Sequence, residues 1–308
     1  MKIVIVIPAF NEEDTIASVI SDIPKFEESE VLVIDDGSLD STAERARQAG
    51  VARVFSFPRN RGLAQAFKKG VEIALEMGAD IIVTIDADGQ YDAKEIPLIV
   101  QPILDGKGDM VLGSRFKGWI EGMPIVKRIG NRIATKVTAS ISGYPVTDAQ
   151  TGFRAFSRGT ALKFNVLAHY TYTQETIIQA AKKGVTIVEV PCSFRKRQGK
   201  SRLITSVFTY AGKVGLTVLT TYRDYEPLKT FMIAGISLFA LGLLTGARVL
   251  VHFFTTGMVT PYVPTAILTS ILLTMGFQMI VLALFADMIG NSRKLQEEIL
   301  QRLKEREF

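Results

Sequence analysis

Cysteine is almost absent from this chain. Cys192 is the only cysteine among the 308 residues, so an intrachain disulfide is excluded, which fits a reducing compartment. A recognisable export signal is also missing, because the apolar run near the N-terminus is short and no small-residue cleavage site follows it. We therefore expect residues 2–7 to form the first buried strand of the fold.

Two common phosphate-binding motifs are missing as well. No G-x-G-x-x-G follows the first predicted strand and no G-x-x-x-x-G-K-[ST] occurs, so neither a dinucleotide fingerprint nor a P-loop is predicted. Charge is only mildly unbalanced, with 36 Lys and Arg against 31 Asp and Glu and a net charge of +5. This basic excess fits an anionic membrane surface or phosphate-bearing substrates, and we expect no nucleic acid partner.

What is present is a regular alternation of apolar runs and amphipathic segments. The runs predict buried strands and the segments between them predict helices. Such alternation is typical of an α/β fold in which helices cover a mostly parallel sheet. The predicted strands are 2–7, 31–35, 54–57, 81–85 and 110–112, and the predicted helices are one that ends near 23 and those at 42–49, 63–77 and 93–104.

Two aspartates follow the predicted strand at 81–85. Asp86 and Asp88 are at positions i and i+2, which point to one side of an extended segment, at the edge where open α/β sheets bind ligands. Two hard oxygen ligands suit Mg²⁺ or Mn²⁺ completed by water and substrate phosphates, and Gln90 offers a neutral oxygen. Taken alone, Asp-x-Asp-Gly is more often an ordinary turn whose carboxylates cap backbone N–H groups.

Acidic residues also follow two other predicted strands. Glu12 comes after the first strand, and Asp35 and Asp36 close the second. Carboxylates suit ribose hydroxyls, base N–H donors and metal ions better than bare phosphate. A nucleotide whose phosphates are neutralised by a metal ion fits this distribution.

Four motifs give the chain a family resemblance. In chain order they are Pro8-Ala9-Phe10-Asn11-Glu12, residues 35–42, Arg61-Gly62-Leu63-Ala64-Gln65-Ala66 and Asp86-Ala87-Asp88-Gly89-Gln90. They resemble the family 2 glycosyltransferases of the GT-A fold, and more narrowly the dolichol-phosphate mannose synthases and related polyprenyl-phosphate glycosyltransferases. The resemblance covers residues 1–205, and its one departure is Gly62-Leu63-Ala64 where Gly-x-Gly is common.

The resemblance implies a donor pocket at the strand ends. The residues that would line the nucleotide are Pro8, Phe10, Glu12, Asp36, Asp86, Ala87 and Asp88. The divalent metal, Mg²⁺ or Mn²⁺, would be held by Asp86, Asp88 and Gln90.

An acceptor side is implied by two further segments. Arg115 follows the strand at 110–112, where it would grip a phosphate bidentately. Residues 147–154 resemble the family's Asp-x-x-(Ser/Thr)-Gly-Phe-Arg segment, which makes Asp148 a candidate. A phosphate monoester is largely ionised at neutral pH, so a catalytic base is optional. We expect Asp148 and Glu175 to contact sugar hydroxyls or to hold Arg154, with a purely structural ion pair as the alternative.

A dense basic group lies at residues 195–202. The charge pattern alone fits a solvated surface or a nucleic-acid patch. The segment also resembles the family loop that closes over the donor diphosphate and the acceptor phosphate, where cations would offset charge on the leaving group. The residues implied in phosphate binding are Arg115, Arg128, Arg132, Arg195, Arg197, Lys200, Ser201 and Arg202. The residues implied in catalysis are Asp88, Arg115, Asp148, Arg195 and Lys200.

Two amphipathic segments are predicted to lie at a membrane surface. Within residues 119–143, Val126, Ile129 and Ile133 recur at helical spacing with basic residues off the stripe, and residues 203–222 repeat the pattern. A basic amphipathic helix can lie in the headgroup region. The alternative is a helix that packs the same stripe on the sheet, and we expect the membrane for at least one of the two segments.

Two uncharged runs predict a transmembrane hairpin, which fits the mean hydropathy of +0.23. Residues 230–247 give roughly 27 Å of helix and residues 265–286 roughly 33 Å. Lys229 and Arg293 flank the outer ends, so the positive-inside rule places the catalytic domain and both termini in the cytoplasm. The predicted parts are a glycosyltransferase domain at 1–227, the hairpin at 228–290 and an amphipathic tail at 291–308 that could contact the membrane or other subunits.

Together these features predict an integral enzyme of the cell membrane. It would transfer a hexose from a nucleoside-diphosphate sugar to dolichyl or another polyprenyl phosphate, with inversion and with a divalent metal. GDP-mannose is the first expected donor, and UDP-glucose or UDP-GlcNAc are alternatives. A processive polysaccharide synthase is disfavoured because Trp119, the only tryptophan, is not in a Gln-x-x-Arg-Trp-type segment. A non-catalytic nucleotide-binding membrane scaffold is disfavoured by the intact acidic and basic sets.

Overall fold

The computed structural model describes residues 1–25, 28–166, 172–196 and 226–308. The chain divides into two compact units. The first comprises Met1–Val214 together with Leu300–Phe308, and the second comprises Gly215–Ile299. Part of the predicted basic loop and the whole amphipathic segment at 203–222 lie outside the described residues.

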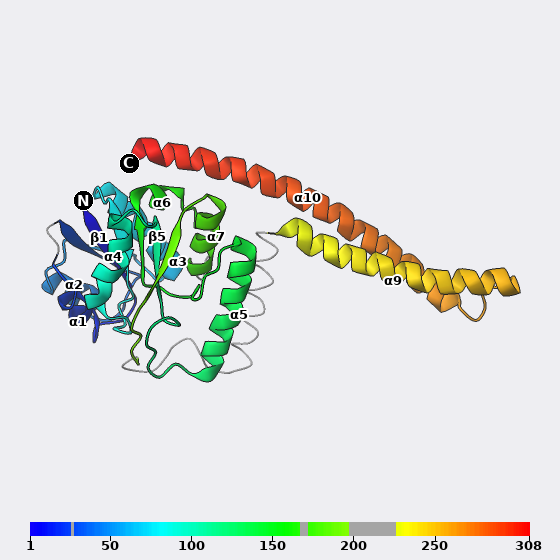
Figure 1. The fold of residues 1–308 in the computed structure, drawn as a ribbon, viewed down its shortest axis with the longest axis horizontal. Helices are drawn as coiled ribbons and strands as arrows, with labels where there is room; N and C mark the ends of the chain where they lie inside the picture. The colour runs from blue at the N-terminus through cyan, green and yellow to red at the C-terminus, as the bar shows by residue number, and fades with distance from the viewer. Residues whose placement is uncertain (26–27, 167–171, 197–225) are drawn as a thin grey trace. The chain divides into compact units, whose positions relative to one another are not determined.

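A seven-stranded sheet forms the centre of the first unit (Figure 1). The strand order is β3-β2-β1-β4-β6-β5-β7, and β6 is the one described strand that runs antiparallel to its neighbours. The strands are β1 Ile3–Ala9, β2 Ser29–Asp35, β3 Arg53–Ser56, β4 Ile81–Thr84, β5 Met110–Ser114, β6 Arg154–Ser157 and β7 Ile187–Pro191. The prediction of a mostly parallel α/β sheet is confirmed.

Helices cover both faces of this sheet (Figure 1). Alternate residues of β1 point to opposite faces, so Val4 and Val6 join the core under α3, α6 and α7, whereas Ile5 and Ile7 join the core under α1, α2 and α4. The helices are α1 Ile16–Ser21, α2 Thr42–Gln48, α3 Leu63–Glu76, η1 Ala93–Glu95, α4 Ile96–Leu104, α5 Ile125–Ser142, α6 Arg158–Lys163 and α7 Thr173–Lys182.

All elements predicted before residue 112 have counterparts in the structure, displaced by a few residues at their ends. The later elements β6, α6, α7 and β7 were not predicted. β6 is only four residues long and begins with Arg154, so it lacks the apolar run that marks the earlier strands. Its place between β4 and β5 depends on pairing with residues far away in the chain.

Helix α5 buries a different face from the one that its apolar residues suggest. The buried positions are mostly small or polar: Gly130, Asn131, Ala134, Thr135, Thr138 and Ile141. Ile125, Ile129 and Ile133 are exposed by 75%, 53% and 47%. Of the predicted stripe, Val126, Ile129 and Ile133 are exposed whereas Ile141 is buried, so only the C-terminal end of the stripe packs inward as the alternative considered above requires.

The second unit is a helical hairpin. It contains α9, Pro227–Thr256, and the part of α10, Val263–Glu307, that extends to Ile299. Glycines allow the two helices to approach closely, since a Cβ at Gly276 would lie 2.6 Å from the backbone nitrogen of Phe239. Both helices are long and apolar enough to cross a membrane, and both extend beyond the predicted spans.

The end of α10 groups with the first unit. The Lys304 ammonium donates to the carbonyl of Phe164 at 2.7 Å, and the Arg158 guanidinium donates to the carbonyl of Phe308. The side chain of Phe308 packs against the core on the α3 face. Contact of the tail with a membrane or other subunits stays a prediction.

Candidate active site

The acidic loop after β4 is held in place by the neighbouring elements. The backbone N–H of Ile85 donates to Val6 at 3.2 Å, and the hydroxyl of Thr15 donates to the carbonyl of Ala87 at 2.7 Å. Ala87 stands between the two aspartates, so this bond to the start of α1 fixes the backbone from which Asp86 and Asp88 project. The structure thus places the pair at the carboxyl edge of the sheet, where it was predicted.

Asp86 is packed against a second loop, residues 148–152. A Cβ at Gly152 would lie 2.7 Å from both carboxylate oxygens of Asp86, so only glycine leaves room for the carboxylate there. The position of Gly152 is fixed because its carbonyl accepts from Thr84 at 2.9 Å and its N–H donates to the Tyr91 hydroxyl at 3.2 Å. Tyr91 was not singled out in the sequence, where one tyrosine after Asp-Gly-Gln carries no distinctive signal.

The electrostatics of the aspartate pair fit a divalent cation. Burial and the neighbouring charge of Asp88 raise the pKa of Asp86 to about 7. Two carboxylates that repel each other in a half-buried position are stabilised by a cation with hard oxygen ligands. Within the described part of the chain no cluster of three acidic, histidine or cysteine residues surrounds them, so other coordination positions would fall to water and substrate.

Gln90 ties this loop to the start of the basic segment. The backbone N–H of Gln90 donates to the Asp88 carboxylate at 3.1 Å, and its side-chain amide donates to the backbone carbonyl of Arg195 at 3.2 Å. The backbone carbonyl of Gln90 accepts from the backbone N–H of Arg195 at 2.7 Å. The guanidinium of Arg195 pairs with Asp92. The structure therefore joins Arg195 to Gln90 and Asp92 of the acidic loop, whereas Arg197, Lys200, Ser201 and Arg202 lie outside the described residues.

Arg115 and Asp148 form a buried ion pair. Nε and one Nη of Arg115 donate to the two Asp148 oxygens at 2.7 and 2.8 Å, and the Arg115 backbone N–H donates at 3.1 Å. The guanidinium carbon of Arg115 lies 5.0 Å from the ring centroid of Phe194. Nε and one Nη of Arg115 are thus occupied and its side chain is buried, so phosphate binding by Arg115 stays a prediction.

Asp148 pairs with Arg115 and not with Arg154, which is the ion-pair alternative considered above. Arg154 is fully buried, and its guanidinium donates to the carbonyls of Thr151, Thr173 and Ala149 and to the Thr176 hydroxyl. These three carbonyls and the hydroxyl are uncharged, but together they accept hydrogen bonds from Nε and both Nη atoms of Arg154. Asp148 is then free to pair with Arg115 across the loop.

Asp36 is engaged in holding the loop after β3. Its buried carboxylate accepts from the backbone N–H groups of Arg61 at 2.7 Å and Gly62 at 2.8 Å, and from the Asn60 amide at 3.0 Å. Burial raises its pKa, against these hydrogen bonds. Gly37 permits the approach, because its φ is +73° and a Cβ there would lie 2.4 Å from the Arg59 carbonyl carbon.

The remaining donor-side residues meet at the same edge. The backbone N–H of Asp36 donates to Ala9 at 2.8 Å, and the backbone N–H of Glu12 donates to the Thr42 hydroxyl at 2.8 Å. These bonds join the loops after β1 and β2, so Pro8, Phe10 and Glu12 share one edge with Asp36. Their contact with a nucleoside stays a prediction.

Three other predicted residues lie on α5 and α7. Arg128 and Arg132 are on the exposed side of α5, where the Arg132 guanidinium carbon lies 5.6 Å from the Phe116 ring centroid. Glu175 is buried in α7, and its carboxylate accepts from Gln179 at 3.3 Å. The structure shows no bond between these residues and the aspartate pair among the contacts it describes.

A mostly parallel α/β sheet with paired carboxylates after a central strand places a candidate ligand site at the edge where open α/β folds bind their ligands. The chain belongs to glycosyl transferase family 2, whose family model matches residues 4–162. The matched region contains both aspartates, Arg115, Asp148 and Gly152.

Named relatives and solved structures extend this comparison. The chain is 35% identical over 213 residues to the UDP-N-acetylglucosamine–dolichyl-phosphate N-acetylglucosaminyltransferase of Methanococcus voltae, covering 61% of this chain and 84% of that protein. It is 32% identical over 201 residues to the dolichyl-phosphate hexose transferase of Haloferax volcanii, covering 65% and 85%. The first unit is similar to glucosyl-3-phosphoglycerate synthase from Mycobacterium tuberculosis in complex with Mn²⁺, UDP and phosphoglyceric acid, with TM-score 0.57, 26% identity and coverage of 73% and 78%.

Proposed function

We propose that this glycosyltransferase moves a hexose from a nucleoside-diphosphate sugar to dolichyl or another polyprenyl phosphate at a membrane. The observation that carries the proposal is the pairing of an Asp86–Asp88 site with a hairpin of two membrane-length helices in one chain. Relatives with dolichyl phosphate in their names support the acceptor class. An isoprenoid acceptor cannot leave the bilayer, which gives the enzyme a reason to be anchored there.

On the donor side, Asp86 and Asp88 would hold a divalent cation, Mg²⁺ or Mn²⁺, with Gln90 beside them. Bound there, the cation would neutralise the diphosphate and so make it a better leaving group. The solved relative in complex with Mn²⁺ and UDP supports this assignment. Pro8, Phe10 and Glu12 would line the nucleoside.

On the acceptor side, the ionised lipid phosphate is itself the nucleophile. It would attack the anomeric carbon in line with the departing diphosphate, and a single displacement inverts that centre. Asp148 does not act as a base in this scheme, because both of its oxygens accept from Arg115. Asp148 holds Arg115 in position, and Arg115 together with Arg195 and the basic residues that follow would bind the phosphates.

The donor is proposed to be GDP-mannose, as the family resemblance suggests, with UDP-GlcNAc and UDP-glucose as the alternatives. The relatives differ on this point, because one name specifies UDP-N-acetylglucosamine and the other only a hexose. A panel of sugar nucleotides incubated with purified protein and a polyprenyl phosphate, followed by mass measurement of the lipid product, separates the three donors. A long polymer among the products would point to a processive synthase instead.

The site assignment is tested by Asp88→Ala. We expect this variant to lose metal-dependent sugar transfer while its thermal unfolding remains cooperative, because one of the two cation-binding carboxylates is gone. Asp105→Ala, which removes an exposed carboxylate at the end of α4, is the matched control and should retain activity. Near-normal transfer by Asp88→Ala would remove the assignment. Absence of turnover with every donor, despite tight nucleotide binding by the unaltered protein, would favour a non-catalytic scaffold.

A further inference from the structure

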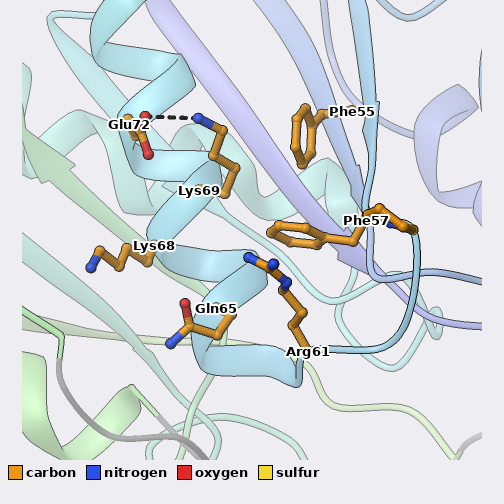
Figure 2. Close-up of a pocket in the computed structure, with 8 residues that line it drawn as sticks. Phe55, Phe57, Arg61, Gln65, Lys68, Lys69 and Glu72 are labelled. Carbon is orange, nitrogen blue, oxygen red and sulfur yellow. Dashed lines mark hydrogen bonds and ion pairs between the residues drawn. The ribbon is translucent and has the colours of Figure 1, made fainter.

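A cavity lies outside the acidic edge, between the edge strand β3 and helix α3. Its volume is about 390 Å³, within the range of small-molecule sites. Figure 2 shows six of its lining side chains that matter here: Phe55, Phe57, Arg61, Lys68, Lys69 and Glu72. None of them belongs to the loops at 85–92 or 148–152 that carry the candidate active site.

One wall of this cavity is aromatic. Phe55 and Phe57 are at positions i and i+2 and meet edge to face, with ring centroids 5.0 Å apart at 86°. Two cations reach over these rings in Figure 2: the Arg61 guanidinium carbon is 5.1 Å from the Phe57 centroid, and the Lys69 nitrogen is 5.5 Å from that of Phe55. Half-buried aromatic rings beneath cations offer a surface for a ligand with an apolar or planar part.

The charged side chains that line the cavity carry an excess of positive charge. Lys69 pairs with Glu72 at 2.7 Å, but in the described part of the chain neither Arg61 nor Lys68 has a carboxylate partner. Arg61 lies beside the Phe57 ring, whereas the Lys68 side chain extends away from the two rings (Figure 2). The pKa of the nearby Lys304 is lowered by burial and by the charges of Lys68 and Lys183, so cations already repel one another on this side.

We propose that this cavity binds a phosphate-bearing ligand whose apolar or aromatic part lies on Phe55 and Phe57 and whose phosphate lies against Arg61. A phosphate monoester carries about −1.5 to −2 charges at pH 7, and the Arg61 cation beside the rings would offset part of that charge. Arginine binds phosphate oxygens with its planar fork, and the fork here is exposed. The ligand is either a soluble phosphate compound or the phosphate of an anionic lipid.

Occupancy of this site would also act on the donor side. The backbone N–H of Arg61 donates to Asp36, which holds the loop after β3. A ligand that orders the Arg61 side chain therefore restrains a loop bonded to a residue of the predicted nucleotide pocket. This coupling rests on the proposed function, whereas the binding itself does not.

The binding test uses phenyl phosphate and inorganic phosphate with the full-length protein in nanodiscs of neutral lipid. EDTA is present, so that metal-dependent binding at the aspartates does not contribute. We expect saturable phenyl phosphate binding with hydrogen-exchange protection in residues 53–72, and weaker binding of inorganic phosphate, which cannot contact the rings. Arg61→Gln should weaken phenyl phosphate binding about tenfold or more, because a charge-assisted hydrogen bond is lost.

Two control variants separate this site from others. Arg47→Gln makes the same change at an exposed arginine of α2, and Asp88→Asn alters the aspartate pair, so both should bind phenyl phosphate as the unaltered protein does. Equal weakening in Arg47→Gln overturns the proposal, and so does absence of protection at 53–72 both with phenyl phosphate and with anionic lipid. These experiments measure ligand binding and hydrogen exchange, not sugar transfer, so they test the cavity independently of the proposed function.

A second arm identifies the source of the ligand. Nanodiscs that contain anionic phospholipid are compared with neutral ones, without added phosphate compound. Protection of 53–72 that appears only with anionic lipid, and is lost in Arg61→Gln, assigns the site to a lipid phosphate. Protection that requires soluble phenyl phosphate assigns it to a soluble ligand. If neither condition protects the segment, the proposal is wrong.

Discussion

At the scale of single residues, the carboxylate of Asp86 is the most informative group. Its environment is unfavourable for negative charge, since it is packed against Gly152 and close to Asp88. A group held in such a place without a cation lowers the stability of the fold at neutral pH. That is the behaviour expected of a residue kept for binding rather than for folding.

A pH dependence of stability follows for the metal-free protein. The pKa of Asp86 is about 7 in the fold, above the ordinary 3.8, so its contribution is complete below pH 3.8 and is lost as pH rises through about 7. Asp86→Asn should therefore raise the melting temperature in EDTA more at pH 8 than at pH 5. A rise of equal size at both pH values would contradict this. Added Mn²⁺ should stabilise the unaltered protein at pH 8 and not Asp86→Asn.

At the scale of elements, α5 is the helix whose function differs from simple packing. It buries small and polar residues and leaves Ile125, Ile129 and Ile133 exposed. Exposed isoleucines next to Arg128 and Arg132 are the combination of side chains expected of a helix that lies in the headgroup region. We therefore keep the prediction that α5 lies at the membrane surface.

Trp119 provides the measurement for this prediction. It is the only tryptophan, it precedes α5 and it is 57% exposed. We expect brominated phospholipids in nanodiscs to quench its fluorescence, and we expect Ile129→Glu with Ile133→Glu to reduce that quenching several-fold, because charged side chains resist insertion. The control places the reporter at the end of α4, as Leu104→Trp in a Trp119→Phe background. Comparable quenching of Trp119 and of the tryptophan introduced by Leu104→Trp would contradict the prediction that α5 is the part of the domain that lies at the membrane surface.

At the scale of the whole molecule, orientation in the membrane can be measured with cysteine labelling. Cys192 is 3% exposed and burial raises its thiol pKa to about 12, so the native chain offers an unreactive background. In intact cells, an impermeant maleimide should label Met258→Cys, in the link between α9 and α10. Ser292→Cys should be labelled only after permeabilisation, because the positive-inside rule places the chain ends in the cytoplasm. The reverse pattern would contradict this topology.

Much of the fold could be predicted because its signals are local. β1, β2 and β4 each contain a run of apolar, mostly β-branched residues, and the predicted helices before residue 112 show apolar residues at helical spacing. The acidic edge was also predictable, since parallel strands bring their carboxyl ends to one side of the sheet. The loops that carry Asp86 and Asp36 could thus be placed together from the order of elements alone.

The sequence by itself therefore determined the strand–helix alternation, the acidic edge, the two membrane-length helices and the family. These depend on residue type and spacing within short segments. Only the tertiary structure decided that Asp148 pairs with Arg115, that Gly152 leaves room for Asp86, which face of α5 is exposed, and that Phe55 and Phe57 line a basic cavity. Each of these depends on contacts with another loop, strand or helix, and such contacts are settled only when the sheet and its helices assemble.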